Sequence, residues 1–225
     1  MNEILSKAII MLKAEFMKRN EGSSHIHEVI PTLPESLSID EQQLYMLHKF
    51  AENNSIYSNS YEMNILDTAC KVYQGDVNNY WLDSIKHDTS YAPFYPIWIL
   101  SAYALAIESK NIGGRQIIDI GSGDGRIAYC AKVVGLESYG IEIDENLVKL
   151  ENKISSSTGV DFHSIIADAT RFDYASLQLS HPIFFISGLP EVGEMLANSV
   201  ISKIIAMPNL KMAPVFVLTG SHVMR

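Results

Sequence analysis

From residue 115 onward, short apolar runs alternate with segments of helical periodicity. The candidate strands are Gln116–Ile120, Tyr139–Ile143, Phe162–Ile166, Ile183–Ser187 and Val215–Thr219. Amphipathic patterns fall between these runs, at Arg126–Val134, Glu145–Ser155 and Glu191–Met207, with a short turn or helix near Tyr174–Leu179. Apolar strands separated by helices are typical of a parallel sheet that is covered on both faces. The pattern therefore predicts an α/β fold with a mostly parallel sheet.

The N-terminal part of the chain shows helical periodicity and no convincing strand alternation. The expected helices lie over Ile4–Phe16, after a capping box at Ser38–Glu41, and over Tyr61–Tyr73 and Val77–Ile85. We therefore expect two units. Residues 1–90 would form an all-helical substrate or lid domain, and residues 91–225 would form the α/β domain.

Residues 117–126, Ile-Ile-Asp-Ile-Gly-Ser-Gly-Asp-Gly-Arg, join the first strand to the first helix of the α/β unit. Alternating glycines allow backbone angles that other residues resist and let a ligand approach closely. Amides at the start of the following helix would face that ligand. Ligands of such sheets bind beyond the carboxyl ends of the strands, where this turn lies. The segment predicts a site for something small and polar.

Two features of this turn argue against a dinucleotide. The dinucleotide fingerprint G-x-G-x-x-G places its third glycine where this chain has Arg126, and an arginine would crowd the helix against the strand. Asp119, two residues before the first glycine, would set a carboxylate near a pyrophosphate. Both features favour a ligand without phosphates.

The pattern of an acid followed by G-x-G-x-G resembles motif I of the class I S-adenosylmethionine-dependent methyltransferases. The resemblance implies a Rossmann-like sheet of strand order 3-2-1-4-5 and S-adenosyl-L-methionine as cofactor. It implies that the loop Gly121, Ser122, Gly123, Asp124 and Gly125 wraps the aminoacyl end of the cofactor, with Asp119 ordering the loop. Asp124 and Arg126 also fit a purely structural role at the start of the helix.

Acids at two further strand ends support this resemblance. Glu142 closes the second strand, at the position where the family binds both ribose hydroxyls. Asp168 follows the third strand, at the family's position beside the adenine amino group, with the Ala169 amide next to it. Ile143 and Ser187 complete the implied cofactor residues. Each acid alone could instead cap the following segment, but three strand ends in the correct order favour the cofactor.

The segment after the fourth strand bears on the methyl acceptor. It reads Ser187-Gly-Leu-Pro, which departs from the Asn/Asp-Pro-Pro-Tyr of methyltransferases that act on planar amines. Leu189–Leu196, together with the motif at Asp119–Ile127, resembles the non-SET protein lysine methyltransferases and their small archaeal relatives. Those proteins carry an aromatic, proline-bearing segment before motif I, and Tyr91–Pro96 occupies that place here without the usual Pro-Thr-Pro. The resemblance implies a protein lysine amine as acceptor.

Methyl transfer to lysine requires a deprotonated amine, because the reference pKa of lysine is about 10.4. A desolvated aromatic channel lowers that pKa and can hold a cation against ring faces. The candidates for its walls are Tyr91, Phe94, Tyr95 and Trp98. Ser187 is placed to touch the acceptor, so Ser187, Tyr91 and Tyr95 are the candidate catalytic residues. The same aromatics would equally suit packing in a core.

Composition bears on the kind of partner and the cellular compartment that we expect. A formal net charge of −9 argues against a nucleic-acid partner held by broad phosphate neutralisation. Neither a targeting segment nor an apolar run of membrane-spanning length is evident, and Cys70 and Cys130 suit a reducing compartment, so we expect a cytoplasmic protein. His25 and His27 have a spacing compatible with metal ligation but lack partners, and no metal is expected.

The C-terminal end leaves alternatives open. The chain stops at Arg225, soon after the last candidate strand, without the antiparallel hairpin usual in the family. An exposed strand edge would favour a homodimer or a cover of N-terminal helices. A methyltransferase acting on a small molecule, and a non-catalytic cofactor-binding regulatory or scaffold protein, are the rival interpretations.

Overall fold

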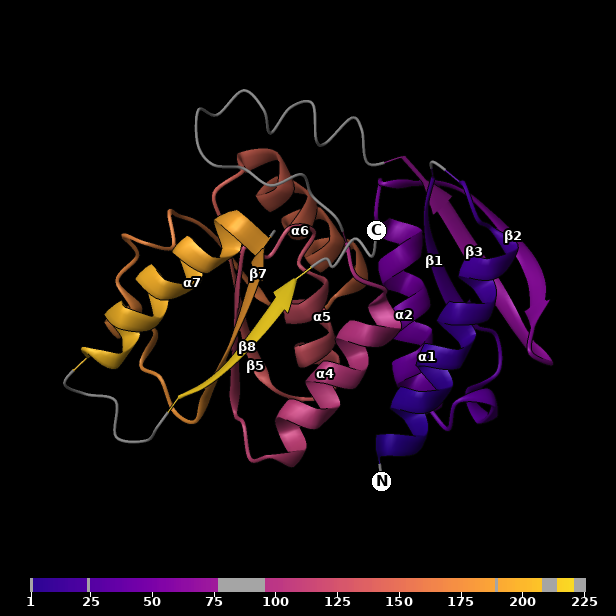
Figure 1. The fold of residues 1–225 in the computed structure, drawn as a ribbon, viewed down its shortest axis with the longest axis horizontal. Coiled ribbons are helices and arrows are strands. Elements are labelled where there is room, and N and C mark those ends of the chain that lie inside the picture. Colours follow the sequence, from indigo (N-terminus) through magenta and orange to yellow (C-terminus); the bar gives the residue numbers. More distant parts are fainter. Residues whose placement is uncertain (1, 24, 77–95, 189, 208–213, 221–225) are drawn as a thin grey trace.

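The computed structural model describes residues 2–23, 25–76, 96–188, 190–207 and 214–220 (Figure 1). The N-terminal half contains α1 (Asn2–Arg19), β1 (Ile26–Pro31), the 3-10 helix η1 (Pro34–Ser36), α2 (Glu41–Asn53), β2 (Tyr57–Ile65) and β3 (Thr68–Gly75). The C-terminal half contains α4 (Ile99–Asn111), β4 (Gln116–Ile120), α5 (Arg126–Val133), β5 (Glu137–Glu142), α6 (Glu145–Thr158), β6 (His163–Ile166), η2 (Tyr174–Leu177), β7 (Pro182–Gly188), α7 (Pro190–Ile205) and β8 (Val215–Gly220).

The C-terminal half forms the predicted α/β sheet. Its strands lie in the order β6-β5-β4-β7-β8, and each neighbouring pair is parallel. Counted from the first strand of this half, the order is 3-2-1-4-5, as in the Rossmann-like methyltransferase fold. The predicted α/β class and strand order are confirmed. Residues 221–225 lie outside the described residues, and within the described chain β8 is an edge strand.

Helices cover both faces of this sheet, which explains why the central strand β4 is buried along its whole length. Ile117 and Phe185 belong to the core on the side of α4, α5 and α6. Ile118 and Phe184 point the other way, into the core beneath α7 and η2. The same separation of helices is visible in Figure 1, where α7 lies on one side of the sheet and α4, α5 and α6 lie on the other.

The N-terminal half is not all-helical, so that part of the prediction is wrong. It holds a three-stranded antiparallel sheet of order β1-β3-β2. The segment predicted as a helix over Tyr61–Tyr73 is a hairpin of β2 and β3, whose turn residues Leu66 and Asp67 have φ of 48° and 60°. Hairpin turns with two positive φ angles usually carry Asn-Gly or Asp-Gly. The Leu-Asp pair at this turn lacks that sequence signal. In addition, β2 is exposed along most of its length, and its burial does not alternate along the strand as a whole.

The two predicted helices that begin this half are present. For α2 the N-cap is Asp40 rather than Ser38, since the Asp40 carboxylate accepts a hydrogen bond of 3.0 Å from the Gln43 N–H. The helix expected over Val77–Ile85 lies outside the described residues.

The N-terminal half and the α/β sheet share one hydrophobic core. Buried residues from α1, α2 and β1 join those of α4, α5 and β4 in a single cluster. The ring of Tyr129 in α5 lies 4.9 Å from that of Phe50 in α2, and its hydroxyl donates to the Met46 carbonyl oxygen at 2.8 Å. In Figure 1, α1 and α2 lie between the two sheets. In the part of the chain that the structure describes, every helix is too short or too polar to cross a membrane.

Candidate cofactor site

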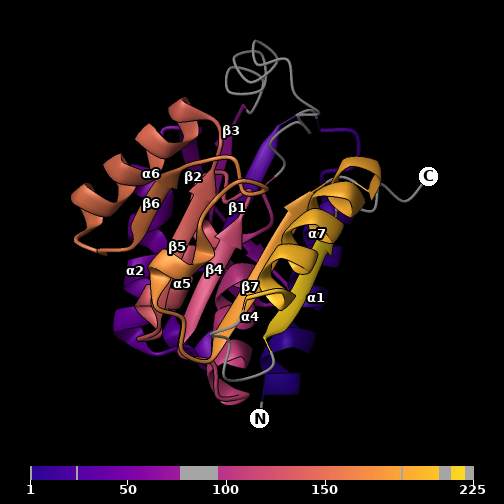
Figure 2. The ribbon, with the colours of Figure 1, turned by 90° about the vertical axis from the view of Figure 1, so that its left-hand side faces the viewer.

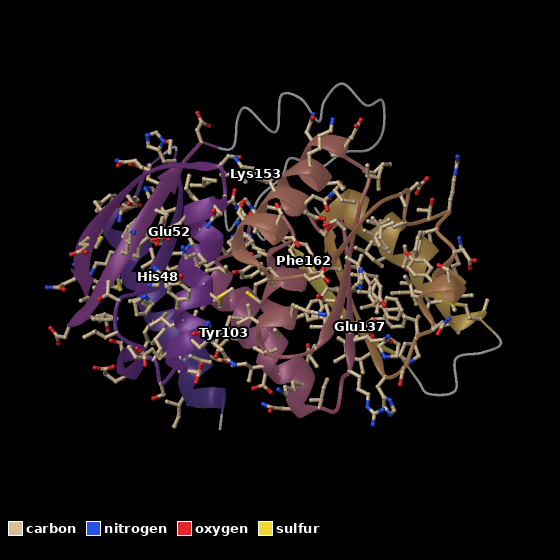
Figure 3. All side chains as sticks on the ribbon, turned by 180° about the vertical axis from the view of Figure 1, so that it is seen from behind. His48, Glu52, Tyr103, Glu137, Lys153 and Phe162 are labelled. Atoms are coloured by element: carbon tan, nitrogen blue, oxygen red, sulfur yellow. The ribbon has the colours of Figure 1, made fainter. Side chains whose placement is uncertain are left out.

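The glycine turn lies at the carboxyl end of β4, on the edge to which the parallel strands all point (Figure 2). Gly121, Gly123 and Gly125 have φ of 71°, 63° and 77°, in the left-handed region that favours glycine. A Cβ on Gly125 would also stand 2.8 Å from the ring of Phe162, which is labelled in Figure 3. The alternation of glycines seen in the sequence is therefore a backbone requirement of the turn.

Glu142 holds this turn from the end of β5. Its Oε2 accepts the Gly123 N–H at 2.9 Å, and its Oε1 accepts the N–H groups of Ile143 and Asp144 at 2.8 and 3.0 Å. Burial raises the pKa of the Glu142 carboxyl, while these three N–H groups favour its ionised form. A carboxylate offers about four acceptor positions, so acceptor capacity for a ligand remains.

Asp119 contributes a buried oxygen without a partner. The residue is 1% exposed, and Oδ1 has no hydrogen-bond partner among the described residues. Burial raises the pKa of the Asp119 carboxyl well above its usual range, and the nearby carboxylates of Glu142 and Asp124 raise it further. An orphan carboxylate oxygen among other acids favours a cationic group as its partner and disfavours a phosphate.

Glu151 is a buried acid beneath the turn that the sequence analysis did not single out. Its Oε1 accepts a hydrogen bond of 2.5 Å from the Ser122 hydroxyl. Burial raises the pKa of Glu151 to about 8, against the effect of the Ser122 hydroxyl. In the sequence Glu151 is one polar residue of the amphipathic helix α6, and only the fold places it against the turn.

The side chains of Asp124 and Arg126 turn away from the strand ends and towards the N-terminal half. Both are buried, and Arg126 Nε donates to Asp124 Oδ1 at 2.8 Å. Asn54, which follows α2, donates its Nδ2–H to Asp124 Oδ2 at 2.8 Å. Arg126 Nη1 lies 2.9 Å from Glu28 Oε2 in β1. The expected crowding of the helix by Arg126 is avoided because its guanidinium is bound in this network.

Asp168 and Ala169 lie beyond the end of β6, next to the strand that carries Glu142. The Ala167 N–H donates to the Glu142 carbonyl oxygen at 2.9 Å, which joins the two strand ends. Asp168 is partly exposed, and the Thr170 hydroxyl, together with the Thr170 N–H, holds the pKa of its carboxyl below the usual value. The structure thus brings Asp119, Glu142 and Asp168 to one edge of the sheet.

The candidate catalytic residues are placed only in part. Ser187 lies in β7, where its backbone pairs with Thr219. Tyr91, Phe94 and Tyr95 lie outside the described residues. Trp98 is not a channel wall, because it is 6% exposed and packs edge-to-face on Phe16 with ring centroids 5.6 Å apart.

The two cysteines and His27 have packing roles in the fold. Cys70 and Cys130 are buried free thiols, and burial raises the pKa of Cys70 to about 11. His27 packs against Phe16 with ring centroids 5.2 Å apart. Over the described ranges, no group of three or more His, Cys, Asp or Glu side chains is arranged to hold a metal ion.

Comparison with known proteins finds similarity only among solved structures. No protein-family model matches this chain, and no curated protein sequence does. The chain is similar to the tRNA (uracil-54, C5)-methyltransferase of Pyrococcus abyssi in complex with S-adenosyl-L-homocysteine, with 16% identity and a TM-score of 0.40 over 49% of this chain and 27% of that one.

Two bacterial structures are similar to about the same extent. The ribosomal protein L11 methylase of Lactobacillus delbrueckii subsp. bulgaricus has 16% identity and a TM-score of 0.42 over 55% of this chain and 61% of that one. An RNA methyltransferase of Salinibacter ruber in complex with S-adenosyl-L-homocysteine has 26% identity and a TM-score of 0.40 over 48% and 70%. This chain thus spans about a quarter of the Pyrococcus enzyme and larger parts of the other two.

Proposed function

We propose that this protein binds S-adenosyl-L-methionine and transfers its methyl group to an acceptor. The observation that carries the proposal is the buried Oδ1 of Asp119 beside the glycine turn, which has no hydrogen-bond partner in the described parts of the chain. This cofactor carries an α-ammonium and a sulfonium and has no phosphate, which matches a sheet edge lined by acids. The site residues therefore fit the group that the sequence motif implies.

Within the proposal, each part of the site has a separate role. The turn Gly121–Gly125 lies against the aminoacyl end of the cofactor, and Asp119 pairs with its ammonium group. Glu142 accepts the ribose hydroxyls, while Asp168 and the Ala169 amide receive the adenine. When bound, the cofactor supplies a methyl group on a positively charged sulfur, which is a good leaving group. Alignment of the acceptor and exclusion of water are then the main tasks of the protein.

We propose a protein lysine amine as the acceptor, held by the substrate or lid unit of residues 1–90. The support is the resemblance of the motifs to the non-SET lysine methyltransferases and the net charge of −9, which suits a basic partner. The described chain resumes at Pro96, and the next carbonyl oxygen, that of Ile97, accepts a hydrogen bond from Arg126. The residues just before α4 are thereby held close to the glycine turn. Ser187 follows Ile186, which pairs with Ile120 just before that turn.

Calorimetry with S-adenosyl-L-homocysteine tests the site. The unmodified chain should bind it, and Asp119→Asn should bind it more weakly, since a neutral amide no longer pairs with the ammonium. The matched control is Asp161→Asn, which changes an exposed acid outside the site. A folded wild-type protein that does not bind the compound would contradict the proposed function.

Transfer of a radiolabelled methyl group into host lysate tests the reaction and the acceptor together. The lysate is separated into protein, nucleic-acid and small-molecule fractions. Label in protein, recovered as methyl-lysine after hydrolysis, is the expected result. Label among small molecules would support the rival enzyme. Tight cofactor binding without label in any fraction would support the scaffold interpretation.

A further inference from the structure

Arg126 uses all five of its N–H donors on partners from separate parts of the chain. Its Nε donates to Asp124 Oδ1 at 2.8 Å, and one Nη2–H reaches Asp124 Oδ2. The other Nη2–H meets the Tyr57 hydroxyl at 3.2 Å. Its Nη1 donates to Glu28 Oε2 at 2.9 Å and to the Ile97 carbonyl oxygen. One guanidinium thus joins the glycine turn to β1, β2 and the segment before α4.

Glu28 is the buried acid that anchors this guanidinium in the N-terminal sheet. The residue is 0% exposed, and its Oε1 accepts the Ile99 N–H at the start of α4 at 2.8 Å. Its Oε2 accepts from Arg126 and, at 3.2 Å, from the Tyr57 hydroxyl. Glu28 therefore fixes the place of Arg126 relative to both β1 and α4.

Asp124 links the position of Arg126 to the backbone of the glycine turn. It lies between Gly123 and Gly125, which both have left-handed backbone angles and no side chain to be held. The Asp124 carboxylate accepts hydrogen bonds from Arg126 and from Asn54. The neighbouring Gly123 N–H is the group that donates to Glu142. A shift of Asp124 would therefore move the amide that meets the proposed ribose-binding acid.

We propose that Glu28 is a positioning residue for cofactor binding, which acts through Arg126 and Asp124 to hold the Gly123–Gly125 turn in its binding conformation. The inference rests on the proposed function, since it concerns the same cofactor. It adds that the N-terminal sheet completes the cofactor site without touching the cofactor.

The test compares Glu28→Gln with Glu62→Gln, an exposed acid in the same sheet. Glu28→Gln replaces the carboxyl group that accepts from Arg126 by an amide and keeps the size of the side chain. Calorimetry with S-adenosyl-L-homocysteine should show about tenfold weaker binding for Glu28→Gln and unchanged binding for Glu62→Gln. Amide hydrogen exchange should rise selectively in residues 121–126 of the folded Glu28 variant, whereas a general loss of stability would raise it across the whole sheet.

Tyr57→Phe provides a milder second variant if Glu28→Gln does not fold. It removes only the hydroxyl that donates to Glu28 and accepts from Arg126, and binding should weaken about threefold. Folded variants that bind S-adenosyl-L-homocysteine as tightly as the wild type would overturn the proposal. Absence of binding by the wild type would instead refute the proposed function, so the two failures are distinguishable.

Discussion

The Gly123 N–H donates a hydrogen bond of 2.9 Å to the carboxylate of Glu142. This bond joins the first two strands of the α/β sheet at their carboxyl ends, where parallel strands place their ligands. It also brings together two of the residues on which the sequence motif depends. The turn and the acid therefore form one structural unit, and a change to either should alter the affinity for the same ligand.

Glu142→Ala should weaken binding of S-adenosyl-L-homocysteine by about tenfold or more. The substitution removes the acceptor of three backbone N–H groups and the proposed acceptor of the ribose hydroxyls, and hydrogen bonds to charged groups contribute about 1.5–3 kcal/mol. Calorimetry on folded protein measures the effect. Glu137→Ala is the control, because Glu137 lies on the same strand at the opposite, exposed end (Figure 3). Unchanged affinity in the Glu142 variant would refute the ribose assignment.

Gly125→Ala should destabilise the fold more than Gly159→Ala does. Both glycines have φ near 75°, at 77° and 73°, so both variants carry the cost of a left-handed alanine, about 1–2 kcal/mol. The new Cβ at Gly125 also stands 2.8 Å from Phe162, whereas at Gly159 no atom of the described residues lies within 4 Å. Overpacking adds about 1–3 kcal/mol. Urea unfolding of the two variants measures the difference, and equal losses would contradict the tight contact.

Glu151→Gln should flatten the fall in stability between about pH 5 and pH 8. The pKa of Glu151 is raised to about 8 in the folded protein, from a usual value near 4.5. A group with a raised folded pKa contributes stability that is present below the unfolded pKa and is lost as pH rises through the folded one. Glutamine cannot ionise, yet its amide oxygen can still accept from Ser122. Urea unfolding at several pH values should show a shallower slope for the variant, and parallel profiles would contradict the buried, neutral acid.

Replacing Leu66-Asp67 by Asn-Gly should stabilise the protein by about 1 kcal/mol. Both positions have positive φ, which Asn and Gly adopt with less strain than Leu and Asp. Asp67→Val should act in the opposite direction, because β-branched residues are strongly disfavoured there. Thermal unfolding measures both variants. A loss of stability with Asn-Gly would contradict the hairpin turn and would favour the helix predicted for this segment.

The five strands of the α/β sheet follow from local patterns, their order follows from the resemblance to the class I methyltransferases, and the structure confirms both. Apolar runs between amphipathic helices leave few arrangements, and the motif at 119–125 marks the strand beside which a ligand can bind. The β2–β3 hairpin was missed because its turn carries no glycine or asparagine and its first strand is exposed. Its strand geometry depends on pairing with β3 and β1 more than on its own residues.

By itself, the sequence determined the parallel sheet, the glycine turn and the acids at successive strand ends, because each depends on neighbouring residues and on a repeating geometry. Only the tertiary structure decided which groups hold that turn. Glu151 and Ser122 are 29 positions apart, and Glu28 and Arg126 are 98 positions apart. Such pairs have no local signature, since a buried acid and its partner are selected by the space in which the folded elements place them. The position of Arg126 at the helix start is evident from the sequence, and only the fold shows that its side chain links the two halves of the protein.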